Sequence, residues 1–170
     1  MAQATTRDWL DGIQKGLLQQ LTENKGALPK GFNQDRFILN SITVIRDMLR
    51  DSKKKKQLQE IDYTSIPICL AKGAFLGLDF FNGECYAIPY GGEMKFQTDY
   101  KGEIKLCKRY SKNEIKDIFA KVVREGDFFE ESVDSGVQNV IYKPLPFSNK
   151  PMVGAFAIVV FKDGSMLYDT

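Results

Sequence analysis

The spacing of apolar residues changes along the chain from a helical repeat to strand-like alternation, and this change constrains the fold more than any other feature. Apolar residues recur every three or four positions through three segments before Gly77, which indicates helices. After Gly77 the pattern is typical of strands separated by glycine-containing turns. Helices followed by strands predict an α+β fold, in which N-terminal helices pack against a mostly antiparallel sheet.

The predicted helices end at recognisable signals. A first helix is expected over about residues 6–23, because Asn24-Lys25-Gly26 disfavours its continuation. Asn33 is a good N-cap for a second helix. A third helix, ending at Gly77, is too rich in apolar residues for a surface helix and is predicted to be central. Between the second and third, the run Lys53–Lys56 is either a solvated helix end or loop, or a patch that contacts phosphate.

The strand half of the chain begins with a β-hairpin. Residues 84–90 and 93–98 are predicted to be its strands, joined by Gly91-Gly92. A short helix is expected over about residues 101–110. The acidic segment 125–136 is predicted to be a flexible loop between two of the later strands. Those later strands are expected at 115–123, 138–142, 152–161 and 165–168.

The composition suits one globular domain and argues against several classes of function. The chain has 170 residues, of which 43% are hydrophobic, and a net charge of +2. It contains no histidine, the commonest general base and metal ligand. Cys69, Cys85 and Cys107 are too widely spaced for a zinc site, so free thiols in a reducing cytoplasm are expected. No apolar run approaches the roughly 20 residues of a membrane span.

No enzyme is predicted from the motifs. The sequence contains no nucleophile elbow, no phosphate-binding glycine loop and no dinucleotide fingerprint. Three carboxylates on or near the hairpin, Glu84, Glu93 and Asp99, leave a magnesium-dependent nuclease as a minor alternative. Acidic side chains on strands usually face solvent, so magnesium is possible but not indicated.

Charge is segregated along the chain. Residues 95–124 include nine basic and four acidic residues, a net charge of +5, whereas residues 125–134 include five acids and no base. The cations of the short helix are spaced four, three and one residues apart and share one broad face: Lys101, Lys105, Lys108 and Arg109. Such a face, with Lys95 on the preceding strand, suits a phosphate backbone, although a charged helix face often serves only solvation.

Aromatic residues interleave with these cations. Proteins that bind single strands combine a basic groove with aromatic rings on which bases stack. Strand aromatics alternate between faces, so some of these rings must belong to the core. We expect Phe96 to be a core residue, and the pattern leaves Tyr90 and Tyr100 open between core and surface. The interleaved set is Tyr86, Tyr90, Phe96, Tyr100 and Tyr110.

Several segments, taken in order, resemble the phage RecT family of single-strand annealing recombinases. The matching segments are Leu28-Pro29 with residues 33–37, the small-residue helix 70–78, the hairpin 86–91, the signature Gln97…Tyr100-Lys101-Gly102…Leu106…Arg109, and residues 154–157. The resemblance divides the chain into an N-terminal helix, residues 1–27, and a single-strand-annealing core, residues 28–170. A domain rarely ends at a strand tip, so a further C-terminal segment is expected beyond Thr170. Cys107 stands where the family often has alanine.

The resemblance implies a function that spacing alone does not show. It implies ATP-independent binding of single-stranded DNA and annealing of complementary strands in phage-type homologous recombination, without a cofactor. It further implies a homo-oligomeric ring or helical filament that holds single-stranded DNA and the annealed duplex. A phage exonuclease and the host single-strand-binding protein are expected partners, in the cytoplasm of a bacterial host.

The same resemblance selects the candidate DNA-binding residues. Gln97, Tyr100, Lys101 and Arg109 are the signature positions. Two cations on the same helix and three chosen on charge alone complete the set: Lys105, Lys108, Lys95, Lys121 and Arg124. Two alternatives stay open: a single-stranded nucleic-acid-binding module without annealing activity, and a self-assembling structural protein whose basic face balances the acidic stretch.

Overall fold

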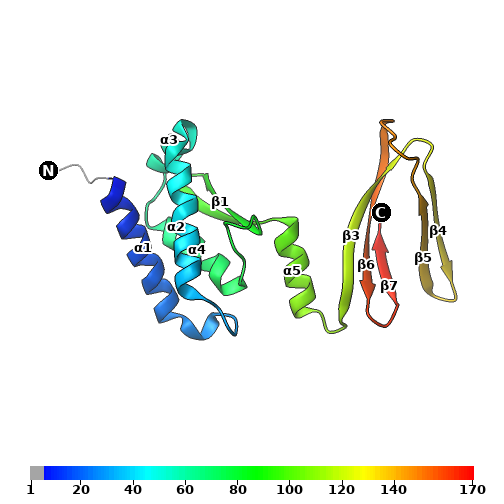
Figure 1. Ribbon diagram of the computed structural model, residues 1–170, viewed down its shortest axis with the longest axis horizontal. Helices are drawn as coiled ribbons and strands as arrows, with labels where there is room; N and C mark the ends of the chain where they lie inside the picture. The colour runs from blue at the N-terminus through cyan, green and yellow to red at the C-terminus, as the bar shows by residue number, and fades with distance from the viewer. Residues whose placement is uncertain (1–5) are drawn as a thin grey trace. The chain divides into compact units, whose positions relative to one another are not determined.

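The computed structural model describes residues 6–170. The chain divides into two compact units, unit 1 (Met1–Leu106) and unit 2 (Cys107–Thr170), whereas the composition suggested one globular domain. Helices make up most of unit 1 and antiparallel strands make up most of unit 2, so the predicted α+β class is confirmed (Figure 1). The boundary expected between residues 27 and 28 stays a prediction about the extent of the single-strand-annealing core.

Unit 1 begins with helices whose ends follow the sequence signals. Asn33 caps α2 as predicted, since its side chain accepts a hydrogen bond from the backbone N–H of Arg36 at 2.9 Å. Gly77 ends α4 in the left-handed conformation, with φ of 62°, which glycine adopts without strain. The helical elements are α1 (Thr6–Glu23), the 3-10 helix η1 (Lys25–Ala27), α2 (Gln34–Arg50), α3 (Ser52–Gln59) and α4 (Ser65–Leu76).

The lysine run lies within a helix of its own. We expected Lys53–Lys56 in a solvated helix end or loop, and the location was wrong, because Asp51 ends α2 and caps α3. The alternative, a patch that contacts phosphate, stays a prediction. The Asp51 side chain accepts a hydrogen bond from the backbone N–H of Lys54 at 2.9 Å, and that bond lowers the pKa of Asp51. Leu58, one turn later, is buried and anchors the helix, while the four lysines are exposed.

Helix α4 occupies the centre of unit 1, as its apolar sequence predicted. It packs against α1 on one side and the hairpin strands on another. The approach of α1 is close, because a Cβ atom on Gly16 would lie 2.9 Å from the Pro67 ring. Burial around this helix raises the pKa of the Cys69 thiol to about 12. The fully buried side chains of α4 are those of Ile66, Cys69, Leu70, Ala71 and Ala74.

The predicted hairpin is present as β1 (Cys85–Tyr90) paired antiparallel with β2 (Glu93–Thr98). Gly91 and Gly92 join the strands with φ of 61° and 78°, the left-handed pair that a two-residue turn of the I′ type requires. The predicted short helix follows as α5 (Tyr100–Tyr110), which begins in unit 1 and ends in unit 2.

Unit 2 consists of a three-stranded sheet and a hairpin, all antiparallel. The sheet has the order β3-β6-β7, and β4 pairs with β5. A small core forms where Phe156 and Ile158 of the sheet meet side chains of the β4–β5 hairpin. The strands are β3 (Ile115–Arg124), β4 (Phe128–Asp134), β5 (Val137–Lys143), β6 (Met152–Phe161) and β7 (Met166–Asp169).

The prediction of a flexible acidic loop was wrong, because residues 128–134 form β4. Phe129 lies opposite Tyr142 of β5, and its ring packs against Phe156 with a centroid separation of 5.1 Å. Glu130, Glu131 and Asp134 of this strand are exposed, and the Glu131 carboxylate accepts a hydrogen bond from the Tyr168 hydroxyl at 3.5 Å. Pairing with β5 and the packing of the Phe129 ring therefore hold this acidic segment as a strand. No helix among residues 6–170 is both long and apolar enough to cross a membrane.

Candidate nucleic-acid interface

The hairpin presents a mixed aromatic and polar outer face. Alternation along β1 and β2 places three residues of each strand outward, and the register sets Tyr86 opposite Gln97, Ile88 opposite Lys95 and Tyr90 opposite Glu93. Tyr90 is 75% exposed. These six residues, called here the hairpin outer face, offer rings and hydrogen-bonding groups side by side.

The opposite side of the hairpin is fixed to the core. Cys85, Ala87 and Met94 are buried there, and Phe96 packs edge-on against Phe80 at 6.1 Å, which confirms Phe96 as a core residue. Burial raises the pKa of the Cys85 thiol to about 12. Because one face is anchored in this way, the outer face is held at a fixed register.

Two hydrogen bonds tie the hairpin to the start of α4. The Ser65 hydroxyl accepts the backbone N–H of Met94 at 2.8 Å. The carbonyl of Gly92, in the turn, accepts the backbone N–H of Asp62 at 2.7 Å. The turn that carries Tyr90 is thereby attached to the central helix.

Helix α5 begins directly after β2, and Asp99 organises its first turn. One oxygen of Asp99 accepts the Lys101 backbone N–H at 3.2 Å, and the other accepts the Tyr86 hydroxyl at 3.1 Å. The neighbouring carboxylate raises the pKa of Tyr86, so the phenol stays protonated. Tyr100 is 67% exposed, and the Lys101 ammonium lies 5.8 Å from the centre of its ring. The first turn of α5 thus places an aromatic ring and a cation beside the hairpin outer face.

Gly102 explains how α5 lies so close to the hairpin base. A Cβ atom at this position would overlap the carbonyl oxygen of Glu84 and lie 3.2 Å from both the Glu84 carbonyl carbon and Leu78 Cδ1. The same Glu84 carbonyl accepts the backbone N–H of Asp99 at 3.0 Å. Only glycine permits this approach without displacing backbone.

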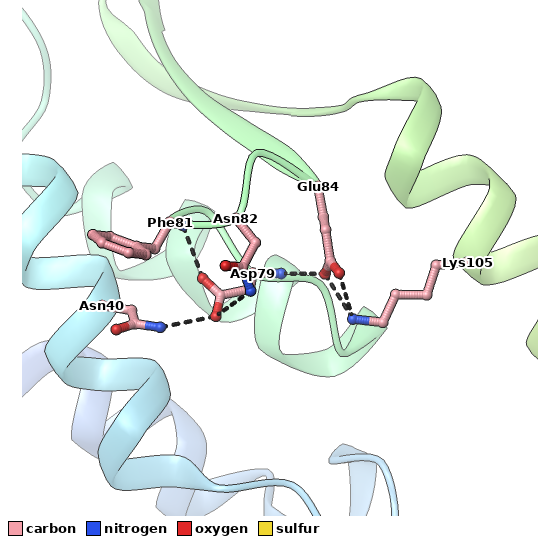
Figure 2. Close-up of polar contacts among 6 residues, drawn as sticks. All are labelled: Asn40, Asp79, Phe81, Asn82, Glu84 and Lys105. Carbon is pink, nitrogen blue, oxygen red and sulfur yellow. Dashed lines mark hydrogen bonds and ion pairs between the residues drawn. The ribbon is translucent and has the colours of Figure 1, made fainter.

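Glu84 is the centre of a polar network that holds α5 in place (Figure 2). Its carboxylate accepts the Lys105 ammonium at 2.7 and 2.9 Å and the Asp79 backbone N–H at 2.8 Å. Asp79 in turn accepts the Asn40 side-chain amide of α2 at 2.8 Å and the Phe81 backbone N–H at 2.8 Å. The network therefore joins α2, the loop before β1 and α5 within unit 1.

The predicted cations of unit 1 differ in how far their charge is already engaged. Lys105 belongs to the Glu84 ion pair, and Lys95 pairs with Glu93 at 2.5 Å. Lys101 forms no ion pair with any of the residues described, and its side chain is exposed. Among these three predicted contacts, Lys101 is therefore the one most available to an incoming phosphate.

The other predicted cations lie in unit 2. Lys108, near the end of α5, is 3.9 Å from Asp117, and the Arg109 guanidinium lies 5.9 Å from the Tyr110 ring centre. Lys121 is exposed on β3. Arg124 donates from Nη1 to the Lys150 carbonyl at 2.7 Å, so part of its guanidinium holds a loop.

Sequence reasoning missed the Glu84 network because its members are far apart in the chain. Glu84 was considered as a magnesium ligand together with Glu93 and Asp99, but the three carboxylates take separate partners: Lys105, Lys95 and Tyr86. Within residues 6–170, no three acidic or cysteine side chains are grouped as a metal site requires. The glycine of the signature is the one local sign that a close backbone approach occurs here.

Comparison with known proteins identifies the family. No curated protein matches this chain. The family model described as the RecT family matches residues 35–170, which include α2, the hairpin, α5 and all of unit 2. This match covers most of the sequence, and the protein therefore belongs to the RecT family of single-strand annealing proteins.

Proposed function

We propose that this protein binds single-stranded DNA and anneals complementary strands in homologous recombination, without ATP and without catalysing a bond-forming or bond-breaking reaction. Membership of the RecT family is the observation that carries the proposal. The hairpin outer face and the first turn of α5 support it, because they place exposed rings beside Lys101, which forms no ion pair among residues 6–170.

The role that we propose for each candidate residue in DNA binding follows from the contacts that its side chain makes. Lys101 and Arg109 bind phosphates, and Gln97 and Tyr100 contact the strand beside them. Lys105 acts mainly by holding α5 against the hairpin through Glu84, since its charge is already neutralised there. Base pairing supplies the sequence specificity, so the protein needs no side chain that reads base edges. The remaining predicted cations, Lys95, Lys108, Lys121 and Arg124, add a weaker attraction for the backbone.

We propose further that the active form is a homo-oligomer, either a ring or a helical filament, along single-stranded DNA and the annealed duplex. Weak contacts of each subunit then add along the strand. A phage exonuclease would supply the single strands, and the host single-strand-binding protein would be a second partner, in the bacterial cytoplasm. No cofactor is required in this scheme.

The test is annealing of two complementary, fluorescently labelled oligonucleotides, with and without the protein and without ATP. The proposal predicts pairing faster than the spontaneous rate, with the acceleration lost at high salt. Binding without acceleration would indicate a plain single-strand-binding module. Oligomers whose formation ignores DNA, with no binding at low salt, would indicate a structural protein instead.

Two substitutions locate the phosphate contacts. Lys101→Gln and Arg109→Gln should each weaken binding and flatten the dependence of log affinity on log salt by about 0.7, the value for one phosphate contact on a single strand. Lys15→Gln on α1 is the matched control, since it removes one exposed cation elsewhere in unit 1. An unchanged slope in both test variants would show that these residues do not contact phosphate.

A further inference from the structure

Phe147 lies in an unusual position, at the tip of the loop between β5 and β6. Its side chain is fully exposed, and its φ of 57° is in the left-handed region. Bulky residues rarely adopt this conformation because Cβ crowds the following carbonyl. An exposed ring in a strained backbone has no role in packing, which leaves function as a reason for its presence.

Phe147 occupies a position in a β-turn that normally favours glycine. The backbone N–H of Ser148 donates to the Leu145 carbonyl at 3.4 Å, so Pro146 and Phe147 are the two central residues of a β-turn. Proline followed by a residue with positive φ is the type II pattern, and glycine is preferred at the second central position. Phenylalanine occupies the position where glycine would relieve the strain.

The loop that carries Phe147 is held firmly by Asp127. One oxygen of Asp127 accepts the Leu145 backbone N–H at 2.8 Å, and the other accepts the Arg124 backbone N–H at 2.9 Å and the Tyr142 hydroxyl at 3.1 Å. Arg124 also donates from Nη1 to the Lys150 carbonyl. One end of the loop is therefore attached to Asp127, in the turn after β3, and the other end to Arg124 of β3, so the ring is presented by a fixed support.

Cations flank this ring in the sequence, at Lys143 and Lys150, and the Lys143 ammonium lies 5.6 Å from the centre of the Phe128 ring at the start of β4. Lys143 ends β5 and Lys150 precedes β6, and both are exposed and form no ion pair within the described part of the chain. The Lys150 ammonium would lie 3.2 Å from a Cβ atom on Gly126, which places it beside the loop base. An exposed ring in a loop that begins and ends beside exposed lysines suits a base and its phosphates better than an apolar protein surface.

We propose that Phe147 stacks on a base of single-stranded DNA, with Lys143 and Lys150 beside the adjoining phosphates. This inference rests on the proposed function and adds a contact in unit 2 that lies outside the hairpin and α5. Stacking on an aromatic side chain typically contributes enough that its removal weakens binding by about 5- to 100-fold.

The test variant is Phe147→Gly, which removes the ring and suits the left-handed conformation. We expect its unfolding temperature to equal or exceed that of the parent, while its affinity for oligo-dT falls by about 5- to 100-fold. The salt dependence of binding should not change, because no charge is lost. Phe147→Tyr, which keeps a ring, should retain the parent affinity. An oligonucleotide backbone with abasic sites should bind the parent and Phe147→Gly equally.

A direct probe accompanies the affinity measurement. Phe147→Trp should show fluorescence quenching on saturation with oligo-dT that the parent, with only Trp9, does not show. Equal affinity of Phe147→Gly and the parent for oligo-dT, or an equal loss on the abasic strand, would overturn the inference. The inference would also be overturned if Phe147→Gly lost self-association without losing affinity for DNA. If the parent itself fails to bind oligo-dT, the proposed function fails first, and the two failures are thereby distinguished.

Discussion

Gly102→Ala tests whether the close approach of α5 to the hairpin base determines the stability of unit 1. Two effects of opposite sign compete at this position. Alanine in a helix is favoured over glycine by about 1 kcal/mol, so helix propensity alone predicts stabilisation. The added Cβ atom, however, meets the Glu84 carbonyl, which is backbone and cannot rotate away. The added Cβ atom would overlap the carbonyl oxygen, so helix and carbonyl must separate by more than about 1 Å to reach ordinary van der Waals contact.

The cost of that separation can be worked out from the contacts that cross it. The hydrogen bond from the Asp99 N–H to the Glu84 carbonyl, 3.0 Å long, would be stretched or lost, at about 1 kcal/mol. Overpacking typically costs a further 1 to 3 kcal/mol, roughly. The partly exposed Lys105–Glu84 ion pair adds less than about 1 kcal/mol after solvent screening. After helix propensity is subtracted, we expect a net destabilisation of about 2 kcal/mol.

Urea unfolding followed by tryptophan fluorescence measures this change. The single tryptophan, Trp9, lies in α1 with its ring 5.6 Å from that of Tyr63, so its emission reports on unit 1. Gly26→Ala is the matched control, because no atom lies within 4 Å of its added Cβ. A Gly102→Ala protein as stable as the parent, or more stable, would refute the steric argument and show that helix propensity is the larger effect.

The thiols and Asp127 provide two further checks. Alkylation with iodoacetamide at pH 8 should modify the exposed Cys107 quickly. Cys69 and Cys85 are buried and their pKa values are raised to about 12, so they should react only after unfolding. Rapid modification of all three thiols would contradict the described core. The hydrogen bond from the Leu145 N–H lowers the pKa of Asp127 below its ordinary value of 3.8. The Asp127 carboxylate therefore contributes its full stabilisation at pH values above 3.8. That stabilisation is lost as the pH falls through the lower pKa of the folded state. The NMR chemical shift of the Leu145 amide should accordingly titrate with a midpoint below pH 3.8, and this titration should be missing in Asp127→Asn. A midpoint at or above pH 3.8 would show that the loop is not held as described.

Much of the architecture could be predicted because its signals are local. The Asn33 cap, the left-handed Gly77 and the Gly91-Gly92 turn each act through neighbouring residues, and each was found where the sequence predicted it. Predictions failed where composition was used in place of periodicity. The lysine run was assigned to a helix end or loop, and the acidic segment to a loop. Asp51 instead caps a helix that contains the lysines, and pairing with β5 holds the acidic segment as a strand.

The sequence by itself determined the elements, their order and the family resemblance, because hydrophobic period, caps and turns depend on residues close together in the chain. Only the tertiary structure decided which charges are available. Lys101 and Lys105 look equivalent on one helix face, yet Lys105 alone meets Glu84, which lies 21 residues away in the sequence. The fixed support of Phe147 likewise depends on Asp127, a residue of a different loop. Ion pairs and close backbone approaches form between distant segments, so no local pattern records them.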